Sequence, residues 1–148
     1  MDLENSIARA CQSRDVHGVK HSHQNLIPPR VLATAGERLR ASAAELRSRE
    51  DFEAMHDLLK ARIGSIRGVG PLQVYDFATR IGLRLGLRPQ RIHLHAGTTQ
   101  GARALGLDVR GRSWLRPGEL PTPLGDLTAG EIEDILCIYK RELADLPR

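Results

Sequence analysis

Apolar residues recur at every third or fourth position over most of this chain, a spacing that predicts a mainly helical fold. The clearest helix is expected at 71–85, where an apolar stripe follows a proline that suits the first helical turn. That stripe consists of Val74, Phe77, Ala78, Ile81 and Leu85. Further helices are expected at 3–13, from 30 to about 49, at 52–63, near 98–105 and from 128 to about 143.

Capping residues and helix breakers sharpen several of these boundaries. Asp51 is placed to cap the helix that begins at Phe52, and Thr128 with Glu131 has the spacing of a capping box. The segment at 86–89 contains Gly and Pro and is expected to end the preceding helix.

The remaining segments predict loops and one short extended stretch. Residues 15–27 read as a loop or a small hairpin, and 108–125, with three prolines, as a loop. Residues 91–95 alternate between apolar and polar side chains, which favours a short extended segment there.

The length of 148 residues predicts a single domain, 1–148, which can bury a core without disulfide or metal staples. Cys11 and Cys137 lie far apart with no paired spacing, which indicates buried thiols in a reducing compartment. There is no long apolar run and no signal-peptide layout. We therefore expect a cytoplasmic protein that does not associate with membranes.

Charge points toward an anionic partner. The formal net charge is +4, and 19 of the 22 basic residues are arginine, whose planar fork suits phosphate. A GC-rich genome would also raise arginine together with Ala, Gly and Leu, so composition alone leaves both explanations open. Residues 80–116 contain eight arginines and one acid, whereas 119–148 contain seven acids and three bases. This asymmetry predicts a basic side that suits a polyanion and an acidic end.

Aromatic residues make up only 3% of the chain, which disfavours a single-strand site built on stacked aromatic side chains.

The sharpest local pattern is at residues 63–74. Two isoleucines three positions apart lead into a Gly-Val-Gly run at 68–70, and a new amphipathic segment begins at once. Glycine adopts φ > 0 without strain and lets a phosphate approach the bare backbone. The helix that follows begins with unpaired N–H groups and the positive end of its dipole.

Residues 58–87 resemble the helix-hairpin-helix superfamily. The resemblance implies sequence-independent contact with a DNA backbone, made by the N–H groups of Gly68, Val69 and Gly70 and by the start of the next helix, where Gln73 lies. Leu72 falls where the family often has a lysine or arginine, and Arg67 beside the turn can replace part of that charge. The alternative is a tight helical corner that binds nothing.

Arg80, Arg84 and Arg88 follow at a spacing of four and are expected to share one helix face. They form either a ridge that contacts phosphates or a solvated outer face.

Two His-x-His pairs suggest other chemistry. On an extended strand, His21 with His23 and His93 with His95 would each point to one face, and together they would form a four-imidazole metal site. No neighbouring Cys-x-x-Cys or His-Glu-x-x-His pattern supports this, so we expect no metal and no cofactor. The same histidines can instead hydrogen-bond loops, or His93 or His95 can act as a general base beside an anion-holding turn at 97–101.

The preferred function is binding of nucleic-acid backbone, DNA rather than RNA, without reading bases. The expected contacts are Arg67, Gly68, Val69, Gly70, Gln73, Arg80 and Arg84. No catalytic residue is assigned. Because a single hairpin binds weakly, a homodimer or a larger protein partner is also expected.

Two alternatives remain open. One is a small enzyme with a His-lined pocket for a phosphate-bearing or nucleotide substrate. The other is an adaptor whose acidic C-terminal helix docks a larger protein, which exposed apolar residues on the helix at 131–143 would favour. The order of motifs along the whole chain is also similar to that of small bacterial proteins, a resemblance that implies no function.

Overall fold

A computed structural model describes residues 2–12 and 27–147. The expected loop at 15–27, with His21 and His23 inside it, falls almost wholly outside this range. The chain divides into two compact units, Met1–Arg88 and Pro89–Arg148, and each has its own cluster of buried apolar residues. The length predicts one domain, but the buried residues form two separate cores.

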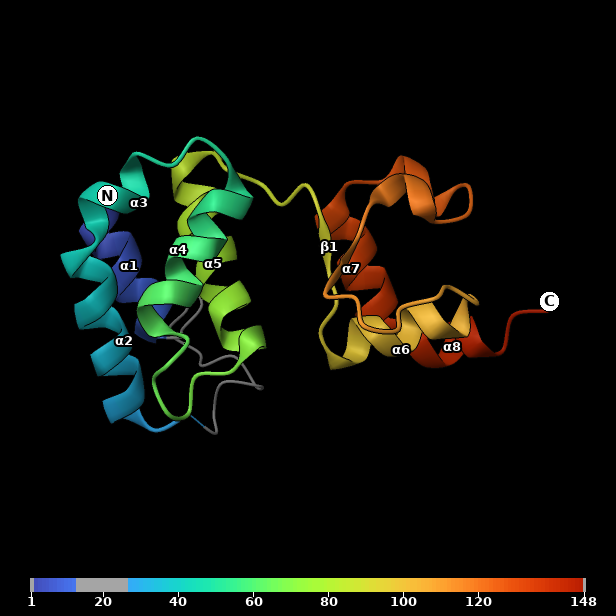
Figure 1. Ribbon diagram of the computed structural model, residues 1–148, viewed down its shortest axis with the longest axis horizontal. Helices are drawn as coiled ribbons and strands as arrows, with labels where there is room; N and C mark the ends of the chain where they lie inside the picture. The colour runs from blue at the N-terminus through green and yellow to red at the C-terminus, as the bar shows by residue number, and fades with distance from the viewer. Residues whose placement is uncertain (1, 13–26, 148) are drawn as a thin grey trace. The chain divides into compact units, whose positions relative to one another are not determined.

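All regular secondary structure in the described part of the first unit is helical (Figure 1). Its helix α1 packs against α2 and α5, and α2 packs against α4. The bounds are α1 Leu3–Gln12, α2 Pro29–Ala41, α3 Ala43–Arg47, α4 Phe52–Ile63 and α5 Pro71–Leu85. The largest fully buried side chains here are Ile7, Leu39, Leu46, Phe52, Met55, Leu59, Ile63, Phe77 and Ile81.

Several predicted boundaries in this unit are confirmed. Asp51 caps α4 by accepting a hydrogen bond from the Ala54 N–H at 2.7 Å. Helix α5 ends at Gly86, which has φ +73°, and the Leu87 N–H donates to the Gly82 carbonyl at 2.8 Å. These two features form a glycine-terminated C-cap in which an orphan carbonyl of the last turn finds a donor.

The helix expected from 30 to about 49 is interrupted at Ser42. The Ser42 N–H donates to the Leu39 carbonyl three residues earlier, which tightens the last turn of α2 and separates it from α3. Both helices still bury apolar positions that were predicted to face inward, Leu39 and Leu46 among them.

The second unit combines helices with a two-stranded antiparallel ribbon. Helix α6 packs on α7 and α8, and β1 packs on α7. The elements are β1 Ile92–His93, α6 Ala96–Ala104, β2 Trp114–Leu115, the short 3-10 helices η2 Pro117–Glu119 and η3 Leu124–Asp126, α7 Ala129–Ile138 and α8 Lys140–Ala144. Its buried cluster is Ile92, Ala102, Val109, Leu115, Leu120, Ala129, Ile132 and Leu136. The described residues as a whole confirm a mainly α fold.

The ribbon confirms the short extended segment near 91–95 and corrects the loop expected after 108. Strand β2 lies in that loop and pairs Leu115 with Ile92 and Trp114 with His93. A strand of two residues is too short to show an alternating pattern in the sequence, so only the structure reveals this pairing.

Close packing of α6 on α7 explains two glycines. A methyl group at Gly101 would collide with the Leu136 carbonyl, and one at Gly97 would lie 2.6 Å from the Cys137 Sγ atom. Both glycines therefore lie inside α6 and allow α7 to approach. This packing corrects the expectation of an open anion-holding turn at 97–101.

The expected C-terminal helix begins as predicted and then breaks. The Thr128 N–H donates to Glu131 at 2.9 Å and the Glu131 N–H donates to the Thr128 hydroxyl, which confirms the capping box. The helix ends at Ile138, and α8 restarts at Lys140. Tyr139, predicted to face inward, lies at this break and is 51% exposed. Among the described residues, no helix is both long enough and apolar enough to cross a bilayer.

Candidate nucleic-acid interface

The candidate site is the α4–α5 hairpin, meaning α4, α5 and the connection at 64–70 (Figure 1). Residues 66–69 form a turn in which the Val69 N–H donates to the Ile66 carbonyl at 2.9 Å. Gly68 occupies the third position of this turn with φ +99°, a conformation that glycine adopts without strain. Val69 is buried and anchors the turn, and a Cβ on Gly68 would lie 3.3 Å from Val31 of α2.

The start of α5 is open to an approaching group. Gly70 is the N-cap, with extended backbone at φ −94° and ψ 174°, and a Cβ there would have no atom within 4 Å. Pro71 has no N–H, while the N–H groups of Leu72 and Gln73 lie in the first turn, where a helix offers no carbonyl acceptor. The helix dipole adds a partial positive charge at this end.

The structure separates the expected backbone donors into two kinds. The Val69 N–H is already engaged within the turn, so the donors that remain at this end are those of Gly70, Leu72 and Gln73. The Gln73 side chain is only 5% exposed, and its Nε2 has no hydrogen-bond partner among the described residues. Gln73 can therefore contribute its backbone N–H, but its side chain points into the first unit. Leu72 is 43% exposed beside these donors.

The four arginines expected near the hairpin differ in their surroundings. Arg67 is exposed at the second position of the turn, and Arg84 is exposed on α5. Arg80 is half-buried and donates to the Ala10 carbonyl at 3.1 Å, which ties α5 to α1. Burial lowers the pKa of Arg80, with the Asp76 carboxylate opposing that shift. Arg88 lies beyond the end of α5. Of the three arginines expected to share one outward face, only Arg84 is therefore both on the helix and exposed.

A group of residues that sequence reasoning missed holds the end of α4 in place. Arg38 of α2 donates to the Arg62 carbonyl at 3.2 Å and to the Ser65 hydroxyl at 3.4 Å. Arg62 in turn forms a two-pronged ion pair with Glu45 at 2.7 and 2.9 Å. These contacts fix the last turn of α4 and the entry to the connection. Arg38 and Arg62 look in sequence like ordinary solvated charges, so no pattern identifies them.

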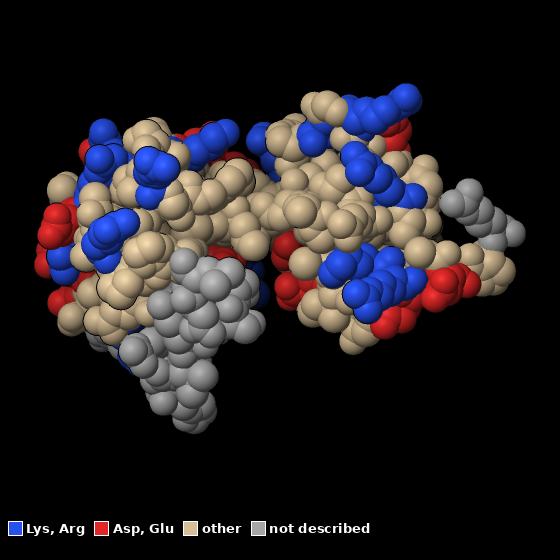
Figure 2. All heavy atoms as spheres, turned by 90° about the horizontal axis from the view of Figure 1, so that it is seen from below, with Lys and Arg blue, Asp and Glu red and all other residues tan. Residues whose placement is uncertain are grey.

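The basic segment at 80–116 does not lie within one unit. Three of its arginines belong to the first unit and five to the second, where Arg110 pairs with Asp108 and Arg112 pairs with Glu119. Figure 2 shows blue side chains next to red ones on the second unit. Residues 1–88 contain 14 Lys and Arg against 10 Asp and Glu, and residues 89–148 contain eight of each. The formal net charge therefore belongs to the unit that carries the hairpin.

Three histidines lie among the described residues: His56 on α4 of the first unit, and His93 and His95 in and just after β1 of the second unit. The rings of His93 and His95 stack with their centroids 6.4 Å apart, and His93 is buried. Among the described residues, no group of three or more His, Cys, Asp and Glu side chains is arranged to hold a metal ion. Nearby, the buried Glu133 carboxylate of α7 accepts a hydrogen bond from the Thr98 hydroxyl of α6 at 3.1 Å.

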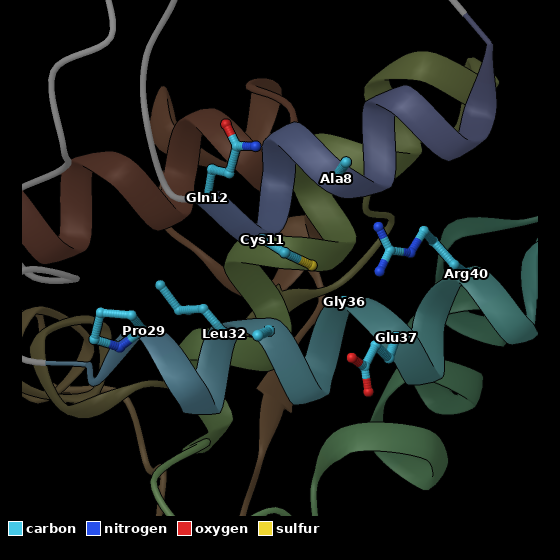
Figure 3. Close-up of a pocket in the computed structure, with 9 residues that line it drawn as sticks. Ala8, Cys11, Gln12, Pro29, Leu32, Gly36, Glu37 and Arg40 are labelled. Atoms are coloured by element: carbon cyan, nitrogen blue, oxygen red, sulfur yellow. The ribbon is translucent and has the colours of Figure 1, made fainter.

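A groove of about 390 Å³ lies between α1 and α2 in the first unit (Figure 3). Figure 3 shows the Cys11 side chain directed toward Gly36 between the two helices, with Glu37 and Arg40 toward one end. Burial raises the pKa of the Cys11 thiol to about 12, although Arg40 and Arg80 oppose the shift. The thiol is therefore neutral at physiological pH, and it is not the thiolate that nucleophilic chemistry requires.

Comparisons of the chain with protein-family models, with curated proteins and with solved structures find no match. Function is accordingly inferred from the geometry above.

Proposed function

We propose that this protein binds the phosphate backbone of duplex DNA through the α4–α5 hairpin, without reading base identity. The observation that carries the proposal is the open start of α5. A Cβ at Gly70 would have no atom within 4 Å, the N–H groups of Gly70, Leu72 and Gln73 lie at this end, and the dipole of a 15-residue helix favours an anion there.

The contacts follow from this geometry. A phosphate oxygen that lies over Gly70 accepts hydrogen bonds from the N–H groups of Gly70, Leu72 and Gln73, and exposed Arg67 adds a positive charge. These donors recognise phosphate alone, so the contact positions the duplex without specifying its sequence. The net positive charge of the first unit supports association with a polyanion.

The test is binding of the full chain to a fluorescently labelled duplex of about 20 base pairs, followed by anisotropy over a salt series. We expect the logarithm of the association constant to fall linearly with the logarithm of salt concentration, because each bound phosphate releases counterions. Gly70→Glu would place a carboxylate where the phosphate lies and should weaken binding by about tenfold, or about 1.4 kcal/mol.

Gly70→Gln is the matched control, since it adds nearly the same volume without charge. Gly70 suits this comparison because its backbone is extended and its Cβ position is empty, so both variants should fold. Gly68→Glu is a poorer probe, because φ +99° and contact with Val31 would destabilise the turn itself. Equal affinity of the Glu and Gln variants would contradict the proposal.

A second candidate function, a protein-interaction adaptor, is favoured by apolar exposure near the end of the second unit. Ile138 is 64% exposed, Tyr139 51% and Leu146 53%. Such side chains commonly mark a protein contact when they lie together. Light scattering of wild type and Ile138→Glu at increasing concentration tests self-association, and a monomer in both cases would exclude a homodimer through this end.

A further inference from the structure

The Arg38 guanidinium of α2 is anchored to the α4–α5 hairpin through a single nitrogen. Its Nη1 atom donates to the Arg62 carbonyl at 3.2 Å and to the Ser65 hydroxyl at 3.4 Å. Within the part of the chain that the structure describes, its Nε and Nη2 atoms have no acceptor, and the residue is exposed. The Nε–Nη2 edge of a guanidinium matches two oxygens of a phosphate. The anchored side chain thus keeps a complete two-pronged edge available.

The charge of Arg38 is not paired with a carboxylate of the described residues. Its two partners, a carbonyl and a hydroxyl, are both neutral. Glu45, the acid of this group, binds the Arg62 guanidinium instead, through both carboxylate oxygens at 2.7 and 2.9 Å. Two arginines and one glutamate leave one net positive charge, and Arg62 is occupied. Arg38 is therefore the member of the group that can still meet an anion.

Helix α2 runs alongside the connection of the hairpin. Val31 lies against the turn, since a Cβ on Gly68 would be 3.3 Å from it, and Arg38 reaches Ser65. Val31 and Arg38 are two helical turns apart on nearly the same face of α2, which is about 10 Å along the helix axis. Over that length one strand of a duplex presents about three phosphates. A DNA backbone that follows the connection can therefore contact the turn and Arg38 together.

Anchoring prepares the Arg38 side chain for a ligand. Part of its rotamer freedom is already lost in the two hydrogen bonds to the hairpin, so less is lost when a phosphate binds. The same two bonds stabilise the last turn of α4, because a basic side chain near a helix C-terminus can satisfy a carbonyl there. That structural role uses Nη1 alone and leaves the other edge for binding.

We propose that the Nε–Nη2 edge of Arg38 binds a second backbone phosphate of the duplex that lies over Gly70. The choice of ligand rests on the proposed function of the hairpin, whereas the residue belongs to a helix outside it. Two weak contacts in one unit reinforce each other, because binding at one raises the local concentration of DNA at the other. Arg38 thereby sets affinity and its salt dependence, and adds no reading of bases.

The test is binding of the full chain to the labelled duplex of about 20 base pairs, followed by anisotropy over the salt series. Arg38→Gln removes the charge and the two-pronged edge but keeps an amide donor for the Arg62 carbonyl. We expect the salt slope to fall in magnitude by about one, for one lost phosphate contact, and binding at about 0.1 M salt to weaken five- to tenfold. Circular dichroism of the variant checks that it is folded.

The matched control is Arg40→Gln. Arg40 is exposed two positions further along α2, but it lines the groove between α1 and α2 (Figure 3), and its loss should leave the slope near the wild-type value. If Arg38→Gln does not fold, Arg38→Lys carries the test, because it keeps the charge but removes the planar edge. It should retain the slope while weakening binding about threefold. Wild-type affinity of Arg38→Lys would overturn the proposal.

The Arg38 contact and the hairpin contact fail in different ways. Equal slopes for Arg38→Gln and Arg40→Gln, with Gly70→Glu still weaker than Gly70→Gln, would remove the Arg38 contact and retain the hairpin. If Gly70→Glu matches Gly70→Gln while Arg38→Gln alone loses slope, the hairpin proposal fails and Arg38 stands as a phosphate contact. Absence of saturable binding to the duplex at low salt would overturn both.

Discussion

At the scale of single residues, Glu119 is held by hydrogen bonds from Arg112 and Arg116. Its hydrogen bonds from the Arg112 side chain and the Arg116 backbone lower the pKa of Glu119 to about 2, so the carboxylate is charged throughout the physiological range. Glu119→Gln keeps an oxygen that can accept the Arg116 N–H but releases the Arg112 guanidinium. Because the folded-state pKa lies below the ordinary value of 4.5, the wild-type protein should lose this contribution to the free energy of unfolding as the pH falls from about 4.5 toward 2, and the variant should lack it.

Urea titrations between about pH 5 and pH 2, followed by Trp114 emission, measure this change, and Asp126→Asn, which removes an exposed acid from η3, is the control. If both variants lose the same part of the acid dependence, general electrostatics rather than the pair with Arg112 is responsible.

Cys11 provides a second prediction at this scale. Its folded-state pKa of about 12 lies above the ordinary thiol value of 9.0, chiefly because of burial. The folded protein therefore retains this proton where the unfolded chain has lost it, and the free energy of unfolding should fall as pH rises from about 9 toward 12. Urea titrations of wild type and Cys11→Ala across this range measure the effect, because the variant lacks the Cys11 contribution. The same alkaline loss of stability in both proteins would contradict the assignment.

The sequence predicts the role of a residue correctly where that role depends only on close neighbours along the chain. Asp51 and the pair of Thr128 and Glu131 cap helices as expected, because a cap requires only neighbours within three positions. Arg80 shows the opposite case. Its spacing suggests an outward phosphate contact, but its partner is the Ala10 carbonyl, 70 positions away, and no local pattern encodes that contact.

At the scale of elements, the crossing of α6 and α7 depends on glycine. Gly101→Ala would force its methyl group against the Leu136 carbonyl, and backbone on both sides limits relaxation. We expect a loss of about 3 kcal/mol in the free energy of unfolding, at the upper end for overpacked sites. Gly118→Ala is the control, because its Cβ would meet nothing within 4 Å and its φ is not positive. Chemical denaturation followed by Trp114 emission compares the two, and equal stability would refute close packing at this crossing.

The sequence predicts long helices and strands more reliably than short ones. Helix α5 was expected at its observed bounds, since four turns of periodic apolar residues and a proline start leave little ambiguity. Strand β2 was missed because two residues carry no period and their pairing partner lies more than 20 positions earlier. The sequence therefore does not predict the pairing of Trp114 with His93. The open N-terminus of α5 was predicted, but the engagement of the Val69 N–H within the turn was not.

At the scale of the whole molecule, two separate apolar clusters replace the single core that the length suggests. Each cluster contains several fully buried side chains, such as Leu59 in the first and Ile132 in the second. Net charge divides along the same boundary, because the positive excess belongs to residues 1–88. A site in one unit can thus be altered without removing buried side chains from the core of the other.

This organisation predicts that the two units unfold as separate cooperative transitions. Trp114 reports the second unit alone, whereas far-UV circular dichroism reports the helices of both. Leu59→Ala removes a fully buried side chain from the first core and should cost about 2–5 kcal/mol there. In urea titrations followed by circular dichroism, the part of the signal that comes from the first unit should be lost at a lower urea concentration than in wild type. The urea midpoint followed by Trp114 emission should stay at the wild-type value. Gly101→Ala should do the reverse and move the Trp114 midpoint. If each variant instead shifts both probes by the same amount, the chain unfolds as one cooperative body, and the effects of hairpin variants on DNA binding would then need correction for the stability of the whole chain.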